Sequence, residues 1–514
     1  MHPFNLAIKK LVMKIHHTHN NVSRLFLVPS LLILALISGC RKFVEIPPPN
    51  SELVTSSTFN NAAAATSAVT NIYTQMFQNT PESVVIAIQN GVLADELTTY
   101  SNSAMSSYFS FYRNAMTSAM SLTFGEWENA YSYIYQANAV IQGLEQYGGG
   151  LKTNVKNQLT GEAYFIRAFW HFYLTNAYGD APIALTTDYK ITSQLSRSPR
   201  LQVLQQVISD LTLAQSFLNS NYIDATDTAT TTDRVRPNKA VASALLARAY
   251  LYKADYDKND PSGYQAAVTA ASSVIGNSAY KLCDNLSGEN SVFLKNSTEA
   301  IWQLFTPLPA NYNTNDGNAF ILLGMPNDSG TEQGNTISPQ LLGAFENDDK
   351  RKANWIGSIT EEGETYYFPY KYKVQTGSAI SEFTMVLRLA EQFLIRAEAK
   401  AELGDVTAVD DLNAVRRRAG LPNYAGARDK ASLLTAIQHE RQVELFTEWG
   451  HRWFDLNRAV HTASTINVNT VMGAPGNVSA AKGGTWSSDG HQQLYPIPLN
   501  EITVNPHITQ NPGY

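Results

Sequence analysis

The stretch that decides the fold is VLRLAEQFLIRAEAKAELGDVTAVDDLNAVRRRAGLP, residues 386–422, followed closely by HERQVELFTEWGHRWFDLNR, residues 439–458. In its first part, small and apolar residues recur at spacings of three and four, the period of one helix face. They are Ala390, Phe393, Leu394, Ala397 and Ala401. A stripe of such small side chains lets a partner helix approach closely.

A second stripe follows after Gly404, whose freedom to adopt positive φ suits the end of a helix. It consists of Ala408, Leu412, Val415 and Ala419, and it ends at Gly420. The pattern predicts two helices joined by a tight turn, a helical hairpin of the tetratricopeptide type.

The next helix carries an apolar face that Arg441 interrupts. A buried guanidinium is too unfavourable to remain without a carboxylate partner. We expect Arg441 to be a structural charge, with Glu444 and Glu448 as its candidate partners. Asp455 is counted with them as a structural residue.

Four segments in this order resemble the SusD/RagB family. They are AEQFLIRAEA, LNAVRRRAGLP, HERQVELFTEWGHRWFDLNR and the closing LYPIPLNEITVNPHITQNPGY, which ends at Tyr514. The resemblance implies an all-α, SusD-like fold. It also implies an outer-membrane protein that binds oligosaccharides, or in some branches peptides, and passes them to a SusC-like TonB-dependent β-barrel.

The amino terminus reads as a lipoprotein signal peptide. An apolar run from Leu25 to Ile37 is too short to span a bilayer comfortably, and it leads into Leu36-Ile37-Ser38-Gly39-Cys40. We expect residues 1–39 to be removed and Cys40 to become the lipidated first residue. Arg41 and Lys42 follow where relatives often carry acids, so an outer-membrane anchor is expected and display on the cell surface is less strongly indicated.

Residues 40–58 then form a tether, and residues 59–514 are expected to be one SusD-like domain. Three further helical hairpins are predicted before residue 284, which makes about four in all. Residues 284–383 are a loop-rich insertion, and residues 384–514 form the signature region. Within it, residues 462–493 are rich in Gly, Ser and Asn and are expected to be surface chain.

Long insertions in compact proteins usually carry function. Aromatic faces bind the apolar faces of sugar rings, and amides and carboxylates bind the hydroxyls. Composition therefore nominates six ligand-binding residues, for each of which a packing role is the alternative. They are Tyr100, Tyr312, Asn313, Asp316, Trp355 and Tyr366.

Other function classes are disfavoured. The charge balance, 38 Lys+Arg against 44 Asp+Glu with no dense basic run, argues against nucleic-acid binding. We find neither a G-x-S-x-G nor an H-E-x-x-H motif, so we expect no enzyme activity, no metal site and no cofactor. The alternatives that stay open are a peptide-binding member of the same importer class and a helical-repeat scaffold.

The segment Leu36-Ile37-Ser38-Gly39-Cys40 has the pattern of a lipobox, the site that the lipoprotein signal peptidase cleaves, and it generates a direct prediction. Labelled palmitate should enter the wild-type protein, because the thiol of Cys40 is the acceptor. Cys40→Ala should remain unlabelled in the same cells. Label retained by that variant would refute lipidation at this residue.

Overall fold

The computed structural model describes residues 50–78, 82–100, 107–308, 311–326 and 334–514. Its contacts divide the chain into two units, Met1–Thr55 and Ser56–Tyr514. In the first unit only the start of helix α2 (Asn50–Phe59) is described. The predicted signal peptide, Cys40 and most of the tether lie outside the described residues.

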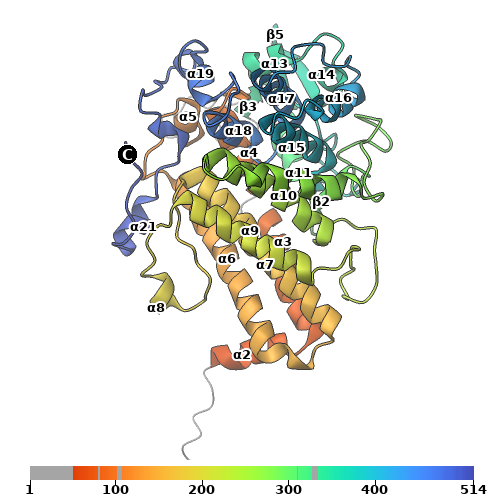
Figure 1. Ribbon diagram of the computed structural model, residues 1–514, viewed down its shortest axis with the longest axis vertical. Coiled ribbons are helices and arrows are strands. Elements are labelled where there is room, and N and C mark those ends of the chain that lie inside the picture. The colour runs from red at the N-terminus through yellow and green to blue at the C-terminus, as the bar shows by residue number, and fades with distance from the viewer. Residues whose placement is uncertain (1–49, 79–81, 101–106, 309–310, 327–333) are drawn as a thin grey trace, which may run out of the picture. The chain divides into compact units, whose positions relative to one another are not determined.

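A ladder of helices forms the body of the second unit, each packed against the next (Figure 1). In chain order these are α3 (Ala62–Gln78), α6 (Ser121–Tyr147), α7 (Thr153–Tyr178), α9 (Arg200–Phe217), α10 (Lys239–Tyr256), α11 (Ser262–Ile275), α15 (Leu389–Glu402) and α16 (Ala408–Arg418). The pairs α7–α9, α10–α11 and α15–α16 are three of the predicted hairpins. Helix α6, for which a neighbour was expected, packs against α7 and less extensively against α3. Gly404 and Gly420 both adopt positive φ, 76° and 84°, at the ends of α15 and α16.

The segment between α11 and α15 is built from short elements rather than open loops. They are β2 (Ala300–Leu304), α12 (Asn315–Phe320), β3 (Asn335–Ile337), α13 (Pro339–Ala344), α14 (Lys350–Trp355), β4 (Ile356–Glu361), β5 (Glu364–Pro369) and β6 (Thr384–Arg388). Strand β2 pairs with β6, and β4 pairs with β5, both antiparallel. Strand β3 pairs with β1 (Leu97–Thr99), which follows α4 (Glu82–Leu93), so the insertion is joined to the amino-terminal helices.

Aromatic side chains form the centre of the main core. Phe169 of α7 lies 5.5 Å from the Trp302 ring of β2 and 5.4 Å from the Trp449 ring, both edge to face. Edge-to-face contacts of this kind stabilise beyond the area they bury. The repeat helices, the insertion and the signature region therefore meet at one ring.

The carboxyl-terminal region contributes α17 (Lys430–Leu445), α18 (His451–Ala459), α19 (Val468–Met472), α20 (Val478–Ala481) and α21 (Leu499–Val504). The expectation that residues 462–493 are surface chain is wrong in part. Val468, Met472 and Val478 are buried in the main core. The helices that carry them, α19 and α20, are too short for an apolar periodicity to stand out in a Gly-, Ser- and Asn-rich segment.

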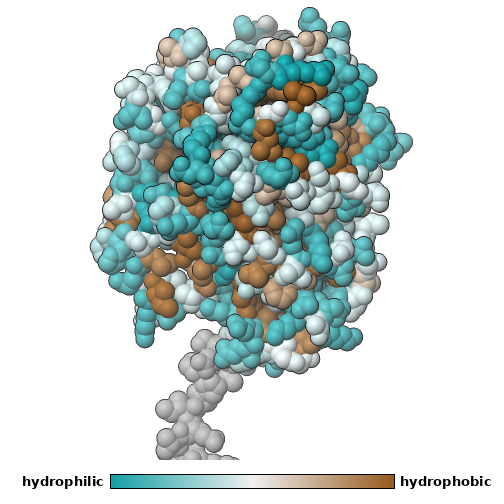
Figure 2. All heavy atoms as spheres, viewed as in Figure 1, coloured by the Kyte–Doolittle hydropathy of each residue, from teal (hydrophilic) through white to brown (hydrophobic). Residues whose placement is uncertain are grey.

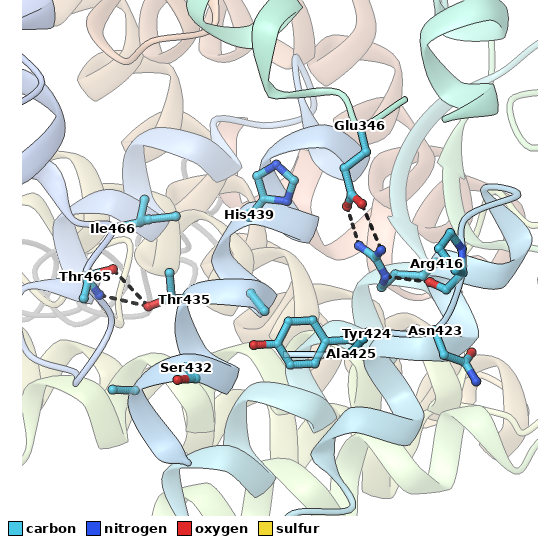
Figure 3. A pocket seen from close by; sticks show the side chains of 13 residues that line it. Glu346, Arg416, Asn423, Tyr424, Ala425, Ser432, Thr435, His439, Thr465 and Ile466 are labelled. Carbon is cyan, nitrogen blue, oxygen red and sulfur yellow. Dashed lines mark hydrogen bonds and ion pairs between the residues drawn. The ribbon is translucent and has the colours of Figure 1, made fainter. Parts of the chain in front are cut away.

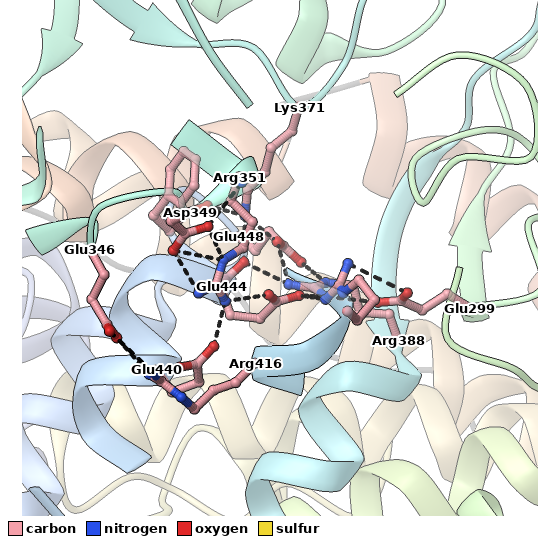
Figure 4. Close-up of polar contacts among 12 residues, drawn as sticks. Glu299, Glu346, Asp349, Arg351, Lys371, Arg388, Arg416, Glu440, Glu444 and Glu448 are labelled. Atoms are coloured by element: carbon pink, nitrogen blue, oxygen red, sulfur yellow. Dashed lines mark hydrogen bonds and ion pairs between the residues drawn. The ribbon is translucent and has the colours of Figure 1, made fainter. Parts of the chain in front are cut away.

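A network of buried charges joins the insertion to α17 (Figure 4). Arg388 Nη1 lies 2.5 Å from Glu444 Oε1 and 2.9 Å from Glu299 Oε1, and Arg388 Nε lies 2.8 Å from Glu448 Oε2. Arg351 Nη1 lies 2.8 Å from the other oxygen of Glu444. Burial alone would raise the pKa of Glu444, but the surrounding guanidinium groups outweigh it and lower that pKa.

Arg441 is a buried structural charge, as expected, but Glu444 and Glu448 are not its partners. Its Nε donates to Asp455 Oδ2 at 2.6 Å, and Asp455 also pairs with Arg458 at 2.8 Å. The two glutamates face the network of Arg388 instead. Helical spacing placed them on neighbouring turns, and only the packing of α18 brings Asp455 to Arg441.

Polar side chains cover most of the face seen in Figure 2, with apolar patches between them. Among the residues that the structure describes, no helix combines the length and apolar character needed to cross a membrane.

Arg441→Met should lower the free energy of unfolding by about 2 to 3 kcal/mol. This is less than the loss for an isolated buried pair, because Arg458 still holds Asp455. Chemical denaturation measures the change. Arg417→Met, at an exposed position of α16, is the matched control and should leave stability within about 0.5 kcal/mol. Equal stability of the two variants would refute the structural role.

Glu126 in the first part of α6 is buried, and neither of its carboxylate oxygens has a hydrogen-bond partner in the described part of the chain. Burial raises the pKa of Glu126 to about 8. The unfolded chain ionises near pH 4.5, so the folded state binds the proton more tightly. The contribution of protonated Glu126 to the free energy of unfolding is fully present below pH 4.5. It decreases as the pH rises from 4.5 to about 8.

Glu126→Gln should therefore stabilise the protein at pH 8 by a few kcal/mol, on the order of 2 to 4, and have little effect at pH 4. Unfolding curves across this range test it. Glu128→Gln, on the exposed face of the same helix, retains Glu126, so its unfolding free energy should follow that of the wild type at both pH values. Parallel curves for wild type and Glu126→Gln would refute the buried neutral carboxyl.

Candidate functional site

Three half-buried tyrosines from separate elements form a group that we name the aromatic cluster: Tyr100, Tyr112 and Tyr366. The rings of Tyr100 and Tyr366 lie edge to face, 5.5 Å apart. Tyr112, the last residue of α5 (Ser107–Tyr112), is close enough to Tyr100 for the two to interact electrostatically. The cluster thus combines aromatic surface with several hydroxyl groups.

Neighbouring threonines hold the hydroxyl groups of the cluster. Tyr100 is hydrogen-bonded to Thr336 of β3, and Tyr112 to Thr98 of β1. Burial raises the pKa of Tyr100 and of Tyr112, so both phenols stay protonated at neutral pH. Protonated phenols both donate and accept hydrogen bonds, which suits ligands rich in hydroxyl groups.

The backbone at Tyr100 is fixed by strand pairing. Thr98 lies opposite Thr336 in the β1–β3 ladder, and the Tyr100 amide donates to the Gly334 carbonyl at 2.7 Å. Side chains of a strand alternate between its faces, so this register decides where Tyr100 points. The position of Tyr100 therefore depends on β1 of the amino-terminal half and β3 of the insertion being paired.

Charged residues from the signature region anchor the turn between α4 and β1. Arg452 of α18 donates two hydrogen bonds to Asp95, both at 2.7 Å. Lys482 Nζ donates to the carbonyls of Val92 at 2.6 Å, Leu93 at 3.2 Å and Ala94. A cation suits the carboxyl end of a helix, where carbonyls lack intrahelical partners. These contacts hold the chain five residues before Tyr100.

A small apolar cluster supports Tyr366 in the β4–β5 hairpin. Phe368 packs against Ile321 and Leu322, and Tyr366 lies against this group. Tyr366 pairs with Ile359 across the hairpin. Its ring is therefore held from behind while part of it faces solvent.

Two of the predicted ligand residues are placed where a ligand does not reach them. Trp355 is fully buried, and its Nε1 donates to the Leu286 carbonyl at 2.9 Å. Asn313 is also fully buried, and its Oδ1 accepts from the Ser381 amide at 2.6 Å. Both predictions are wrong, because composition does not distinguish an aromatic or amide that packs from one that faces solvent.

Tyr312 and Asp316 lie apart from the aromatic cluster along α4. The Tyr312 ring stacks on Phe77 at 6.4 Å, and Asp316 accepts from Ser83 Oγ at 3.2 Å near the start of α4. Tyr100 follows the end of α4, on the order of 15 Å further along the helix axis. Burial raises the pKa of Asp316 to about 7. Of the six nominated residues, the structure brings Tyr100 and Tyr366 together.

The sequence interpretation missed Tyr112 and the threonines. Tyr112 belongs to the Ser- and aromatic-rich segment that begins at Tyr100, so the signal was present. Thr98 and Thr336 bond the tyrosine hydroxyls only because β1 pairs with β3. The two strands are far apart in the sequence, so this pairing could not be predicted from it.

A separate pocket of about 790 Å³ lies between the loop after α16 and one face of α17 (Figure 3). Its polar groups engage one another: Arg416 Nη1 lies 2.5 Å from Glu346 Oε1, and the hydroxyls of Thr435 and Thr465 are 3.1 Å apart. His439 Nε2 lies 2.8 Å from the Ala344 carbonyl. Tyr424 is the one tyrosine among its lining residues, so the pocket offers less aromatic surface for a sugar than the aromatic cluster does.

Comparison with known proteins gives matches at both ends of the chain. A family model described as "SusD family" matches residues 346–514. A second, described as "Starch-binding associating with outer membrane", matches residues 42–251. The match to residues 42–251 ends before the insertion, and the match to residues 346–514 begins within it; together they include Tyr100, Tyr112 and Tyr366.

Relatives and solved structures agree with these matches. The SusD-like protein P2 of Formosa agariphila is 24% identical over 535 residues, which cover 94% of this chain and 98% of that protein. The crystal structure of a SusD superfamily protein from Parabacteroides distasonis shares the fold, with a TM-score of 0.72, 23% identity, and coverage of 88% of this chain and 98% of that one. Surface glycan-binding protein A from Bacteroides uniformis matches with a TM-score of 0.66, 20% identity, and coverage of 83% and 93%. From its amino-terminal helices to its closing segment, the chain belongs to the SusD/RagB family.

Proposed function

We propose that this protein is an outer-membrane lipoprotein that binds an oligosaccharide at the aromatic cluster and delivers it to a SusC-like TonB-dependent β-barrel. The observation that carries the proposal is the Tyr100–Tyr366 pair, 5.5 Å between ring centroids, on a half-buried surface with hydroxyl groups around it. The family description, with its starch binding and outer-membrane association, supports the same function.

The chemistry of the cluster suits a sugar. A pyranose ring presents C–H bonds on its faces and hydroxyls at its edge, so a ligand site for it needs aromatic surface and hydrogen-bonding groups together. Tyrosine supplies both from one side chain. Tyr366 belongs to β5, Tyr112 is the last residue of α5, and Tyr100 directly follows β1, with its amide bonded to the Gly334 carbonyl. Rings held in this way lose little conformational entropy when a ligand binds.

We include no cleavage step in the proposal. Glycoside hydrolysis requires two carboxyl groups on either side of the scissile bond. The aromatic cluster itself consists of phenols and threonine hydroxyls, which bind sugars, and the exposed carboxylates nearby, Glu362 and Glu364, both lie at the β4–β5 turn. The surface glycan-binding neighbour from Bacteroides uniformis is named for binding.

Tyr100→Ala and Tyr366→Ala should each weaken glycan binding several-fold, because one aromatic contact contributes about 0.5 to 1.5 kcal/mol beyond burial. A glycan array on the soluble chain that begins at Arg41 identifies the ligand, and calorimetry on the strongest array ligand measures the loss. Tyr135→Ala is the matched control, since this tyrosine is 56% exposed on α6 and lies outside the cluster.

Unfolding curves accompany these titrations. Unchanged affinity in both folded cluster variants would place the site elsewhere. Shortened products released from the bound glycan would contradict the absence of catalysis. Recovery of the protein without a TonB-dependent barrel, after mild solubilisation of the outer membrane, would contradict the proposed partner.

A further inference from the structure

The segments that build the aromatic cluster contain no basic side chain. Residues 56–112 carry Tyr100 and Tyr112, residues 296–349 carry Thr336, and residues 353–370 carry Tyr366. None of the three contains Lys, Arg or His. Lys and Arg number 38 in 514 residues, so stretches of this combined length would ordinarily hold roughly nine of them. The depletion coincides with the surface proposed to bind the ligand.

The charged side chains that these segments do bring to the surface are acidic. The turn between β4 and β5 carries Glu361, Glu362 and Glu364, of which the last two are exposed. Glu364 lies two residues before Tyr366 and is close enough to Tyr100 to interact with it electrostatically. A ligand bound across the two rings therefore meets negative potential at this end.

The basic groups near the aromatic cluster are engaged by other protein groups. Lys482 Nζ lies 5.1 Å from the centroid of the Tyr112 ring, but it is buried and donates to the carbonyls at the end of α4. Arg113 donates from Nε and Nη2 to the Gly483 carbonyl, at 2.8 and 2.5 Å. Lys371 is buried against Glu448, and Lys373 donates to the carbonyls of Asn354 and Tyr370. Lys352 is exposed, but it lies on α14 ahead of the buried Trp355.

We propose that the aromatic cluster selects uncharged glycans and rejects glycans that carry carboxylate or sulfate groups. The proposal rests on the proposed function and adds the class of ligand. An anionic sugar on Tyr366 would place its charge near Glu364, and the buried Lys482 beside Tyr112 already donates to backbone carbonyls. Repulsion and lost hydration then both oppose binding, whereas a neutral sugar needs only aromatic contact and hydroxyl partners. The cluster would then select neutral glycans because anionic glycans bind less well, and not because neutral glycans gain an extra contact.

The test uses the full soluble chain and an array of neutral, uronate-containing and sulfated polysaccharides. The strongest ligand should be neutral. A partially sulfated derivative of that same glycan is then prepared, and calorimetry compares the two. We expect at least a tenfold weaker affinity for the sulfated derivative at 20 mM salt, and a smaller difference at 500 mM, because salt screens the repulsion. Affinity for the neutral glycan should not depend on salt.

Charge variants test the stated cause. Glu364→Gln should reduce the difference between the neutral glycan and its sulfated derivative by several-fold, with little effect on the neutral glycan. Glu145→Gln, an exposed glutamate of α6, should leave the difference unchanged. An equal effect of both substitutions would overturn the local role of Glu364.

Other outcomes separate this proposal from the function on which it rests. A uronate-containing or sulfated glycan as the strongest ligand, with binding lost in Tyr366→Ala, would overturn the selectivity and leave the glycan-binding function intact. Binding of a basic peptide with no glycan bound would overturn both.

Discussion

The fold depends on the buried ion pairs around Glu444. This carboxylate, fully buried at the end of α17, accepts from Arg388 at 2.5 Å and from Arg351 at 2.8 Å. Burying an ion is unfavourable unless its hydrogen bonds are replaced in good geometry, so each of these groups requires the others to be in place. Arg388 ends β6 and precedes α15, whereas Arg351 belongs to α14 of the insertion. One carboxylate thus ties the last repeat to the insertion.

The same segment also reaches the proposed binding surface. Arg452 of α18 pairs with Asp95 ahead of β1, and Trp449 contacts Phe169 in the main core. The family-like sequence of residues 439–458 therefore does not itself contact a ligand in our proposal. Through the Arg452–Asp95 pair it holds the turn before β1, the strand that Tyr100 follows.

Charge is distributed unevenly between these two parts. Buried arginines gather around α17 and α18, where carboxylates compensate them, while the segments of the aromatic cluster contain acids but no bases. In the core around α17 and α18, each buried charge is compensated by a partner; on the surface, we propose that the acidic groups near the aromatic cluster disfavour anionic ligands. A chain with a net charge of only −6 can therefore present a locally acidic surface at the proposed binding site.

The sequence by itself determined the helical hairpins, the glycines that end α15 and α16, and the family, because these depend on spacing within short segments. It also identified Arg441 as structural, and it nominated Tyr100 and Tyr366. Only the tertiary structure decided that Asp455 rather than Glu444 pairs with Arg441, that Trp355 is core, and that Tyr112 joins the cluster. The physical reason is that strand pairing and helix docking set contacts between residues far apart in the chain, and periodicity along one segment carries no information about them.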